Sequence, residues 1–482
     1  MSTSTTNFLS QPEIEANDPK WASIYKNMQG NILKGHGRDH ATMIFLSFGQ
    51  KNKTPTRKAL KEFAENQVTS FYKQLWERER YKRNKVPGDI FCSLFITQKG
   101  YEYLEDETLL GDKAFIAGLK ARPELNDSPV PNESGYYNTI HVMLLLADDD
   151  KDRMDIAAGK VIAEMDKVAT ILHVEYGDAI RNSNKDGLEH NGYVDGVSQP
   201  LFLKDEVDEY VKQHGIKRGV KSDADDGFAF NPIKTPGLVL LKDPYVKQNE
   251  GIYGSYFVFR KLEQKVKAFK KQESTIGIAM YGKKAEENER AGAMLVGRFE
   301  DGTPIQVQGE DKLIGSGAFN NFNYDPSGGA CPHFAHIRKT NPRKVEGKNI
   351  YKFDDNAIAR RGIPYGHRNV NTELNEIRDD QFPVDGVGLL FMSYQQSIET
   401  QFEVIQKRAN FNDVSAAAKD GGVDPVIGQT PEGMKRTNYE FPKDAEQKPD
   451  AVLNHEFDQH IHFKGGEYFF APSMAYLDKL IP

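Results

Sequence analysis

The order of apolar segments in the first half of the chain constrains the fold more than any other feature of the sequence. Four apolar runs of strand length are interspersed with two segments whose apolar residues recur every three or four positions, the period of a helix buried on one face. The order strand–helix–strand–strand–helix–strand is that of a ferredoxin-like unit. We predict strands at 40–49, 90–97, 139–147 and 170–177, one helix with a buried face from Leu60 to Leu75, and a second helix that includes Ala158 and Val168.

The same order of elements returns, with longer interruptions, in the second half of the chain. A Gly- and Asp-rich stretch at 221–237 separates the halves and is our candidate domain boundary. The sequence therefore predicts an α+β fold of two ferredoxin-like domains, each with an antiparallel sheet and peripheral helices. In the second half we predict strands at 255–262, 388–395 and 468–472, a helix that starts at Leu262, and a helix that includes Ile398 and Ala409.

A long irregular stretch lies between residues 270 and 384. Segments of this length without regular structure are rare in compact domains unless they carry function or wrap around something. We expect a bound cofactor to supply the core that this stretch lacks.

Composition excludes several classes of protein. The 482 residues carry a formal net charge of −7, so the chain offers no excess of cations for a nucleic acid backbone. The N-terminus has no basic and apolar signal pattern, and apolar runs such as 142–147 are too short to cross a bilayer. Only Cys92 and Cys331 occur, which favours a reducing compartment. We therefore expect a cytoplasmic protein that binds neither nucleic acid nor membrane.

The segment CPHFAHIRKTNPR, at 331–343, contains the first candidate for chemistry. His336 lies among small and apolar residues, and arginines follow it. An iron porphyrin needs one imidazole beneath its plane and cations for its carboxylates, which matches this pattern. His333 and His336 could alternatively bind zinc, because they are three residues apart. An ordinary core histidine is the third reading.

Two further segments combine polar side chains with a constrained backbone. In NGYVDGVSQP, Asp195 is flanked by Gly192 and Gly196, which allow the backbone to approach a flat ligand closely. In ARRGIPYG, Arg360 and Arg361 precede a Gly-Ile-Pro sequence that we interpret as a rigid turn. Taken alone, each segment is better explained without a function, as a turn aspartate and as a pair of solvated surface arginines.

Taken together, these three segments resemble the dye-decolorizing peroxidase family, and in particular its longer cyanobacterial-like and fungal-like branch. The likeness extends from about residue 29 to residue 476, with all motifs in the family's order. Further matching stretches are GNILKGHGRDHA (30–41), GSYFVFRKLEQ (254–264), GRFEDGTPI (297–305), DPVIGQ (424–429) and GGEYFFAPS (465–473).

The resemblance implies a division into a polar extension at 1–39, an N-terminal domain at 40–235 that carries the GxxDG loop, and a C-terminal haem-binding domain at 236–482. It implies that haem b is bound through His336 as the proximal iron ligand. Asp195 would be the distal acid–base residue and Arg360 the distal arginine, because Arg360 stands two residues before Gly362. The remaining implied haem contacts are Arg343 at a propionate, Asp424 on the proximal imidazole, and Leu389 and Phe391 on the distal face.

The implied activity is a haem-dependent peroxidase that uses hydrogen peroxide to oxidise dyes and other aromatic electron donors, as a monomer or a homodimer. An aspartate base favours an acidic optimum, because a carboxylate stays ionised where a histidine is protonated. For bulky donors we expect surface tyrosines or tryptophans to relay electrons, with Tyr394 and Trp76 as first candidates. A haem storage, sensor or carrier protein is the alternative, and a haem-free binding protein is a third reading.

Overall fold

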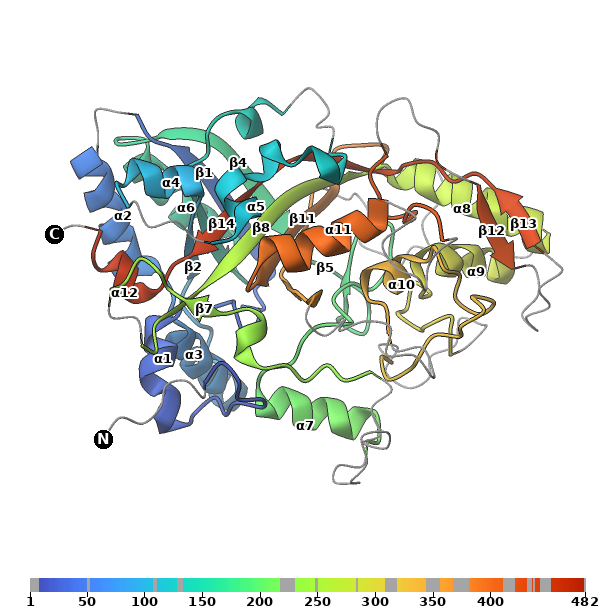
Figure 1. Cartoon of the computed structure of the whole chain (residues 1–482), viewed down its shortest axis with the longest axis horizontal. Coiled ribbons are helices and arrows are strands. Elements are labelled where there is room, and N and C mark those ends of the chain that lie inside the picture. The colour runs from blue at the N-terminus through green and yellow to red at the C-terminus, as the bar shows by residue number, and fades with distance from the viewer. Residues whose placement is uncertain are drawn as a thin grey trace.

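The computed structural model describes residues 8–49, 53–106, 111–127, 133–216, 230–247, 250–282, 285–307, 319–343, 356–367, 381–410, 421–430, 436, 438–442 and 452–480. A long curved sheet forms the centre of the molecule, with helices outside it, and the segments around α10 lie at one end (Figure 1). Among the described residues, no helix combines the length and the apolar character that crossing a membrane requires.

The first ferredoxin-like unit has the predicted strands in the order β4-β1-β3-β2, and all neighbouring strands are antiparallel. Nearly every residue of the three inner strands is buried, because side chains on both faces of these strands pack into apolar cores. The predicted strands are therefore confirmed. They are β1 (His40–Ser47), β2 (Phe91–Ile96), β3 (Val142–Asp148) and β4 (Thr170–Asp178).

The helical segment between the first two strands differs from our prediction. We predicted one helix through Leu60–Leu75, but the chain forms α2 (Lys53–Gln67) and then α3 (Phe71–Asn84). Ser70 begins the second helix, because its side chain accepts a hydrogen bond from the backbone N–H of Lys73. The apolar period runs through this break although the two helices bury their residues in different apolar clusters, Leu60 and Phe63 of α2 in one and Phe71 and Leu75 of α3 in the other. The second predicted helix is confirmed as α6 (Lys151–Met165), but it ends before Val168, which we predicted to lie in it.

The second unit repeats this topology, with strand order β14-β8-β11-β10. The ARRGIPYG segment is not the turn that we predicted, since both of its strands pair with β11. The stretch from 270 to 384 is also less irregular than predicted, because it contains most of α8 and all of α9. The elements are β8 (Tyr253–Gln264), α8 (Val266–Tyr281), α9 (Ala285–Val296), β9 (Ala359–Arg360), β10 (Ile363–Tyr365), β11 (Gly388–Gln395), the π-helix η10 (Ile398–Phe402), α11 (Glu403–Asn410) and β14 (Ile461–Ala471).

The two units join into one continuous sheet. Strand β14 pairs with β2 at Phe470 and Ile96, and the opposite ends of the sheet also meet, because β10 packs against β4. A Cβ added at Gly177 of β4 would lie 2.4 Å from Ile363 Cγ2 of β10, so glycine permits this close approach. The sheet therefore curls around an apolar interior. We propose that the units divide near residue 235, between β4 and β8; most of the 221–237 stretch lies outside the described residues.

One apolar cluster lies inside the curled sheet, and another lies between the sheet and its outer helices. Tyr394 belongs to the inner cluster and is 0% exposed, so its assignment as a surface relay is wrong. Trp76 on α3 is 54% exposed. The N-terminal residues Phe8 and Trp21 also pack into the inner cluster.

The other described elements are short. They are η2 (Pro19–Trp21), α1 (Ala22–Asn27), α4 (Gln98–Tyr103), α5 (Lys113–Ala117), η3 (Leu119–Ala121), η4 (Pro123–Leu125), η5 (Ser134–Tyr137), β5 (Ile180–Arg181), β6 (Gly187–Leu188), α7 (Lys204–Gln213), η6 (Pro236–Leu238), β7 (Leu241–Lys242), α10 (His336–Thr340), β12 (Tyr439–Pro442), β13 (Val452–His455) and α12 (Met474–Leu477).

Candidate active site

The loop that follows β6 carries Asp195 and is held by its backbone. Gly192 and Gly196 have φ values of 101° and 82°, which explains why glycine stands on both sides of the aspartate. The Asp195 N–H donates to the Gly187 carbonyl at 2.9 Å, and the Val194 N–H donates to the Glu300 carbonyl at 3.1 Å. These contacts fix the direction in which the Asp195 side chain leaves the loop.

Asp195 and Arg360 form an ion pair. Arg360 Nη1 lies 3.0 Å from Asp195 Oδ1, although 164 residues separate the two in the chain. Both side chains are partly exposed, at 35% for Asp195 and 28% for Arg360. The Gly196 N–H also donates to Asp195 Oδ1, at 2.6 Å. The structure therefore brings together the two residues that we predicted to act as distal acid–base group and charge stabiliser.

His336 begins the short helix α10, and its Nδ1 lies 2.9 Å from Asp424 Oδ2. Burial alone would raise the pKa of Asp424, but the adjacent His336 and the backbone N–H groups of Val426 and Ile427 bring the pKa below its usual value. An ionised Asp424 accepts a hydrogen bond from the Nδ1–H of His336. Nε2 of His336 is then the nitrogen that can bind a metal. The predicted pairing of these two residues is present in the structure.

Two buried arginines, Arg343 and Arg298, have the chemistry that the carboxylates of a haem require. Arg343 and Arg298 are 5% and 4% exposed, and both donate to Asn320 Oδ1 and to main-chain carbonyls. Burial lowers the pKa of Arg298 to about 9 and also lowers that of Arg343. No carboxylate among the described residues forms an ion pair with either, and Arg343 Nε has no hydrogen-bond partner there. Two adjacent uncompensated cations fit the two propionates of a haem.

Sequence reasoning identified Arg343 but assigned no role to Arg298. The signal was present in GRFEDGTPI, which contributed only to the family resemblance. Asn320 brings the two arginines together, because its Oδ1 accepts from both and also from Ser198 Oγ at 2.9 Å. Asn320 thereby connects the Asp195 loop with the segment that follows His336.

Leu389 and Phe391 lie on the same face of β11 and are both half-buried. The residues between them point the other way, and Leu390 and Met392 belong to the cluster inside the curled sheet. Leu389 and Phe391 therefore face away from that interior. This orientation is compatible with lining a ligand site, and their contact with haem stays a prediction.

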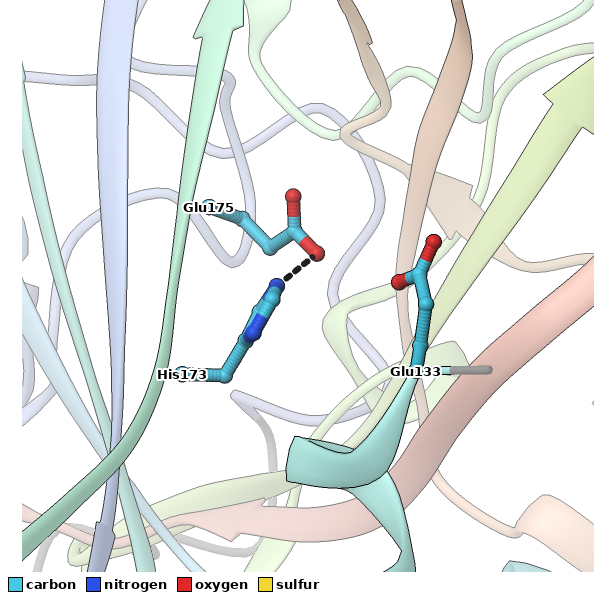
Figure 2. Close-up of side chains that lie close together, drawn as sticks. All are labelled: Glu133, His173 and Glu175. Atoms are coloured by element: carbon cyan, nitrogen blue, oxygen red, sulfur yellow. Dashed lines mark hydrogen bonds and ion pairs between the residues drawn. The ribbon is translucent and has the colours of Figure 1, made fainter. Parts of the chain in front are cut away.

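Within the described part of the chain, no third residue completes a zinc site with His333 and His336. Among the described residues, the group with the spacing of a metal site is Glu133, His173 and Glu175, which lies elsewhere (Figure 2). Lys261 Nζ lies 3.0 Å from Glu133 Oε2 and 2.9 Å from Glu175 Oε1. We assign no ion to this group, because a lysine already compensates its charge.

Comparison with known proteins shows the family to which the chain belongs. The family description "Dyp-type peroxidase, C-terminal" matches residues 239–420. The multifunctional dye peroxidase DyP2 of Amycolatopsis sp. is 37% identical over 471 residues, which cover 95% of this chain and 96% of that protein. The crystal structure of an Anabaena sp. DyP-type peroxidase superposes with a TM-score of 0.87 at 34% identity and covers 100% of both chains. The DyP2 structure gives 0.85 at 35% identity, covering 97% of this chain and 99% of that one.

The chain therefore belongs to the dye-decolorizing peroxidase family. It is a haem-dependent peroxidase, an oxidoreductase that acts on hydrogen peroxide.

Proposed function

We propose that Asp195 and Arg360 activate hydrogen peroxide at a haem whose iron His336 would hold. The 3.0 Å ion pair between Arg360 and Asp195 carries this proposal, because it joins an acid–base group to a fixed positive charge. When bound, haem supplies the redox-active iron at which peroxide is cleaved and through which donors are oxidised.

Asp195 moves the proton. Both hydrogen bonds that the described residues make to its carboxylate go to Oδ1, from Arg360 and from the Gly196 N–H. We therefore assign the transfer to Oδ2, which takes a proton from one peroxide oxygen and returns it to the other, so that this oxygen leaves as water. The two bonds to Oδ1 hold the carboxylate still during both transfers.

Arg360 has two tasks. Its guanidinium, 3.0 Å from Asp195 Oδ1, holds that carboxylate in place, and it stabilises the negative charge that develops as the O–O bond breaks. Asp424 accepts a hydrogen bond from the Nδ1–H of His336. This contact orients the imidazole and increases the basicity of its other nitrogen. Arg343 would hold a propionate, with Arg298 beside it, and Leu389 and Phe391 would line the distal face.

We further propose that the cofactor is haem b. The two cysteines are far apart in the sequence and form no C-x-x-C-H attachment motif, and both Cys92 and Cys331 are buried free thiols. Free thiols also support our proposal of a cytoplasmic location. The electron donors would be dyes and other aromatic compounds, with the protein acting as a monomer or a homodimer.

Rapid mixing of the haem-loaded protein with hydrogen peroxide tests the proposal. Asp195→Asn should retain haem and slow the first spectral change by about 10²- to 10⁴-fold, because the amide cannot accept the proton. A variant that reacts at the wild-type rate would remove Asp195 from the mechanism. A wild-type protein that binds haem but does not react would instead support the storage or carrier reading.

A further inference from the structure

The side-chain amide of Gln199 makes a two-point contact with the main chain of Arg360. Gln199 Nε2 donates to the Arg360 carbonyl at 3.2 Å, and the Arg360 N–H donates to Gln199 Oε1 at 3.1 Å. We propose that Gln199 is a positioning residue that fixes Arg360 relative to Asp195. This inference rests on the proposed role of Arg360 and assigns a further residue to the same site.

The backbone of Arg360 needs such a partner because β9 is only two residues long. On one edge it pairs with β11, where the Arg361 N–H donates to the Met392 carbonyl at 2.7 Å. In an antiparallel pair, the N–H and C=O of the preceding residue then point to the opposite edge. At that edge the Gln199 amide takes the place of a neighbouring strand, since it offers one donor and one acceptor with the spacing of a peptide group. The Arg360 carbonyl also accepts from Arg361 Nη1 at 2.7 Å, whereas Gln199 Oε1 is the acceptor for the Arg360 N–H.

Gln199 also lies only four residues after Asp195, in the same loop. One short stretch of backbone therefore holds both partners of the ion pair: Asp195 through its own side chain, and Arg360 through Gln199. Ser198, which lies between them in the sequence, donates to Asn320 Oδ1, the same atom that accepts hydrogen bonds from the two buried arginines Arg298 and Arg343. Errors of about 1 Å in the position of a catalytic group can cost about 100-fold in rate, so this coupling has a direct kinetic consequence.

The fold contains a matched control. Gln29 makes the same two-point contact with Leu94 of β2, donating to its carbonyl at 2.9 Å and accepting from its N–H at 3.0 Å, and its Nε2 also donates to the Pro472 carbonyl at 2.9 Å. Leu94 packs in the outer apolar cluster, and none of the proposed site residues contacts it through a hydrogen bond. Loss of this contact should affect stability without affecting the reaction.

The experiment compares Gln199→Met with Gln29→Met, because methionine keeps the side-chain length and removes the two side-chain hydrogen bonds of Gln199 and the three of Gln29. Three properties are measured: the rate of reaction with peroxide, the Kd of cyanide for the resting haem protein, and the Tm. Cyanide must lose a proton on binding, so its Kd reports on the Asp195–Arg360 pair without turnover.

Gln199→Met should slow the reaction and weaken cyanide binding, each by about 10- to 100-fold, with Tm nearly unchanged. Gln29→Met should lower Tm only. A wild-type rate and cyanide Kd in Gln199→Met would overturn the inference.

Gln199→Glu gives a second readout that does not depend on how well methionine is tolerated. A protonated carboxyl group has one donor and one acceptor, as the amide has, whereas the ionised group lacks the donor. The peroxide rate of Gln199→Glu relative to wild type should therefore recover as the pH falls. A ratio that is constant with pH, or that falls further, would contradict the positioning role.

The double variant Gln199→Met/Arg360→Leu separates this inference from the proposed function. If Gln199 acts through Arg360, the double variant should be no slower than Arg360→Leu alone. An additional slowing would show that Gln199 acts by another route. A wild-type rate in Arg360→Leu alone would refute the proposed function itself.

Discussion

Arg360 and Arg361 are neighbours in the sequence, but their guanidinium groups serve different parts of the molecule. Arg360 reaches Asp195, whereas Arg361 donates through Nε to the Asn31 carbonyl at 2.7 Å and through Nη2 to the Ile32 carbonyl at 2.9 Å. Burial lowers the pKa of Arg361 to about 10. Arg361 thus anchors the N-terminal segment and is not the solvated surface residue that its sequence suggests.

Substitution of Arg360 should therefore affect the reaction rate, and substitution of Arg361 should affect stability. Arg360→Leu should keep its haem and slow the peroxide reaction by about 10²- to 10⁴-fold. Arg361→Leu should leave that rate within about tenfold and lower the free energy of unfolding by about 1–3 kcal/mol for each carbonyl left without a donor. Stopped-flow absorbance and thermal unfolding measure the two effects. Equal kinetic damage in both variants would place the wrong arginine at the site.

His336 and His333 provide a similar comparison for the proximal side. His336→Ala should lose most of its haem, because His336 is the imidazole that pairs with Asp424 among the described residues. His333→Ala should retain haem, since its ring packs against Gly328 rather than Asp424. Haem content per polypeptide, from the Soret absorbance of purified protein, distinguishes the two. Retention by His336→Ala together with loss from His333→Ala would reverse the assignment.

The lowered pKa of Asp424 leads to a prediction about how haem affinity depends on pH in acidic solution. Its pKa is lowered in the folded protein, so its contribution to stability is present above the ordinary aspartate pKa of about 4 and is lost as the pH falls through the lower folded value. Wild-type protein should therefore keep haem down to about pH 4. Asp424→Asn should already bind haem about 10- to 100-fold more weakly at neutral pH. The difference between the two should shrink below pH 4 in a haem-release titration; a difference that grows there would contradict this account.

Arg298 should contribute to haem affinity. Arg298→Met removes one of the two buried cations, and the remaining Arg343 can neutralise only one propionate. We expect a clear loss of haem affinity, measured by transfer of haem to an excess of a haem-binding acceptor protein. Arg260→Met is the control: Arg260 is also buried but pairs with Asp127, so its loss should reduce stability and spare haem affinity. Comparable haem loss from both variants would argue against a propionate contact.

The pH–rate profile for dye oxidation should peak below neutrality. The proposed base is a carboxylate, which stays ionised in mildly acidic solution, where a histidine base with an ordinary pKa near 6.5 would be lost. Steady-state rates across the acidic and neutral range, with enzyme stability checked at each pH, provide the measurement. An optimum above neutrality would oppose an aspartate base.

The repeated order of elements was readable in the sequence because the strands are apolar and short. The first four strands and β11 were predicted almost at their observed limits. The break at Ser70 was missed, since the apolar period continues across it, and β9 and β10 were missed because Gly362 and Pro364 resemble a turn. Their pairing with β11 is a tertiary property that no local pattern encodes.

The site was predictable only in part for the same reason. His336, Asp195 and Arg360 stand in recognisable motifs, and the structure brings Asp195 to Arg360 and Asp424 to His336. Arg298 and Gln199 also lie in the motifs GRFEDGTPI and NGYVDGVSQP, but their roles could not be assigned from these motifs, because the roles come from contacts with residues more than 20 positions away. Tyr394 was misplaced because burial inside a curled sheet depends on closure of the whole sheet.

The central claim is that Asp195 and Arg360 act on peroxide across a haem held by His336. Its most direct test is the visible spectrum of the purified, haem-loaded protein before and after one equivalent of hydrogen peroxide, recorded on the millisecond scale. We predict a rapid change of the Soret band in the wild type and a change at least about 100-fold slower in Asp195→Asn and Arg360→Leu. Equal rates in all three proteins would contradict the account.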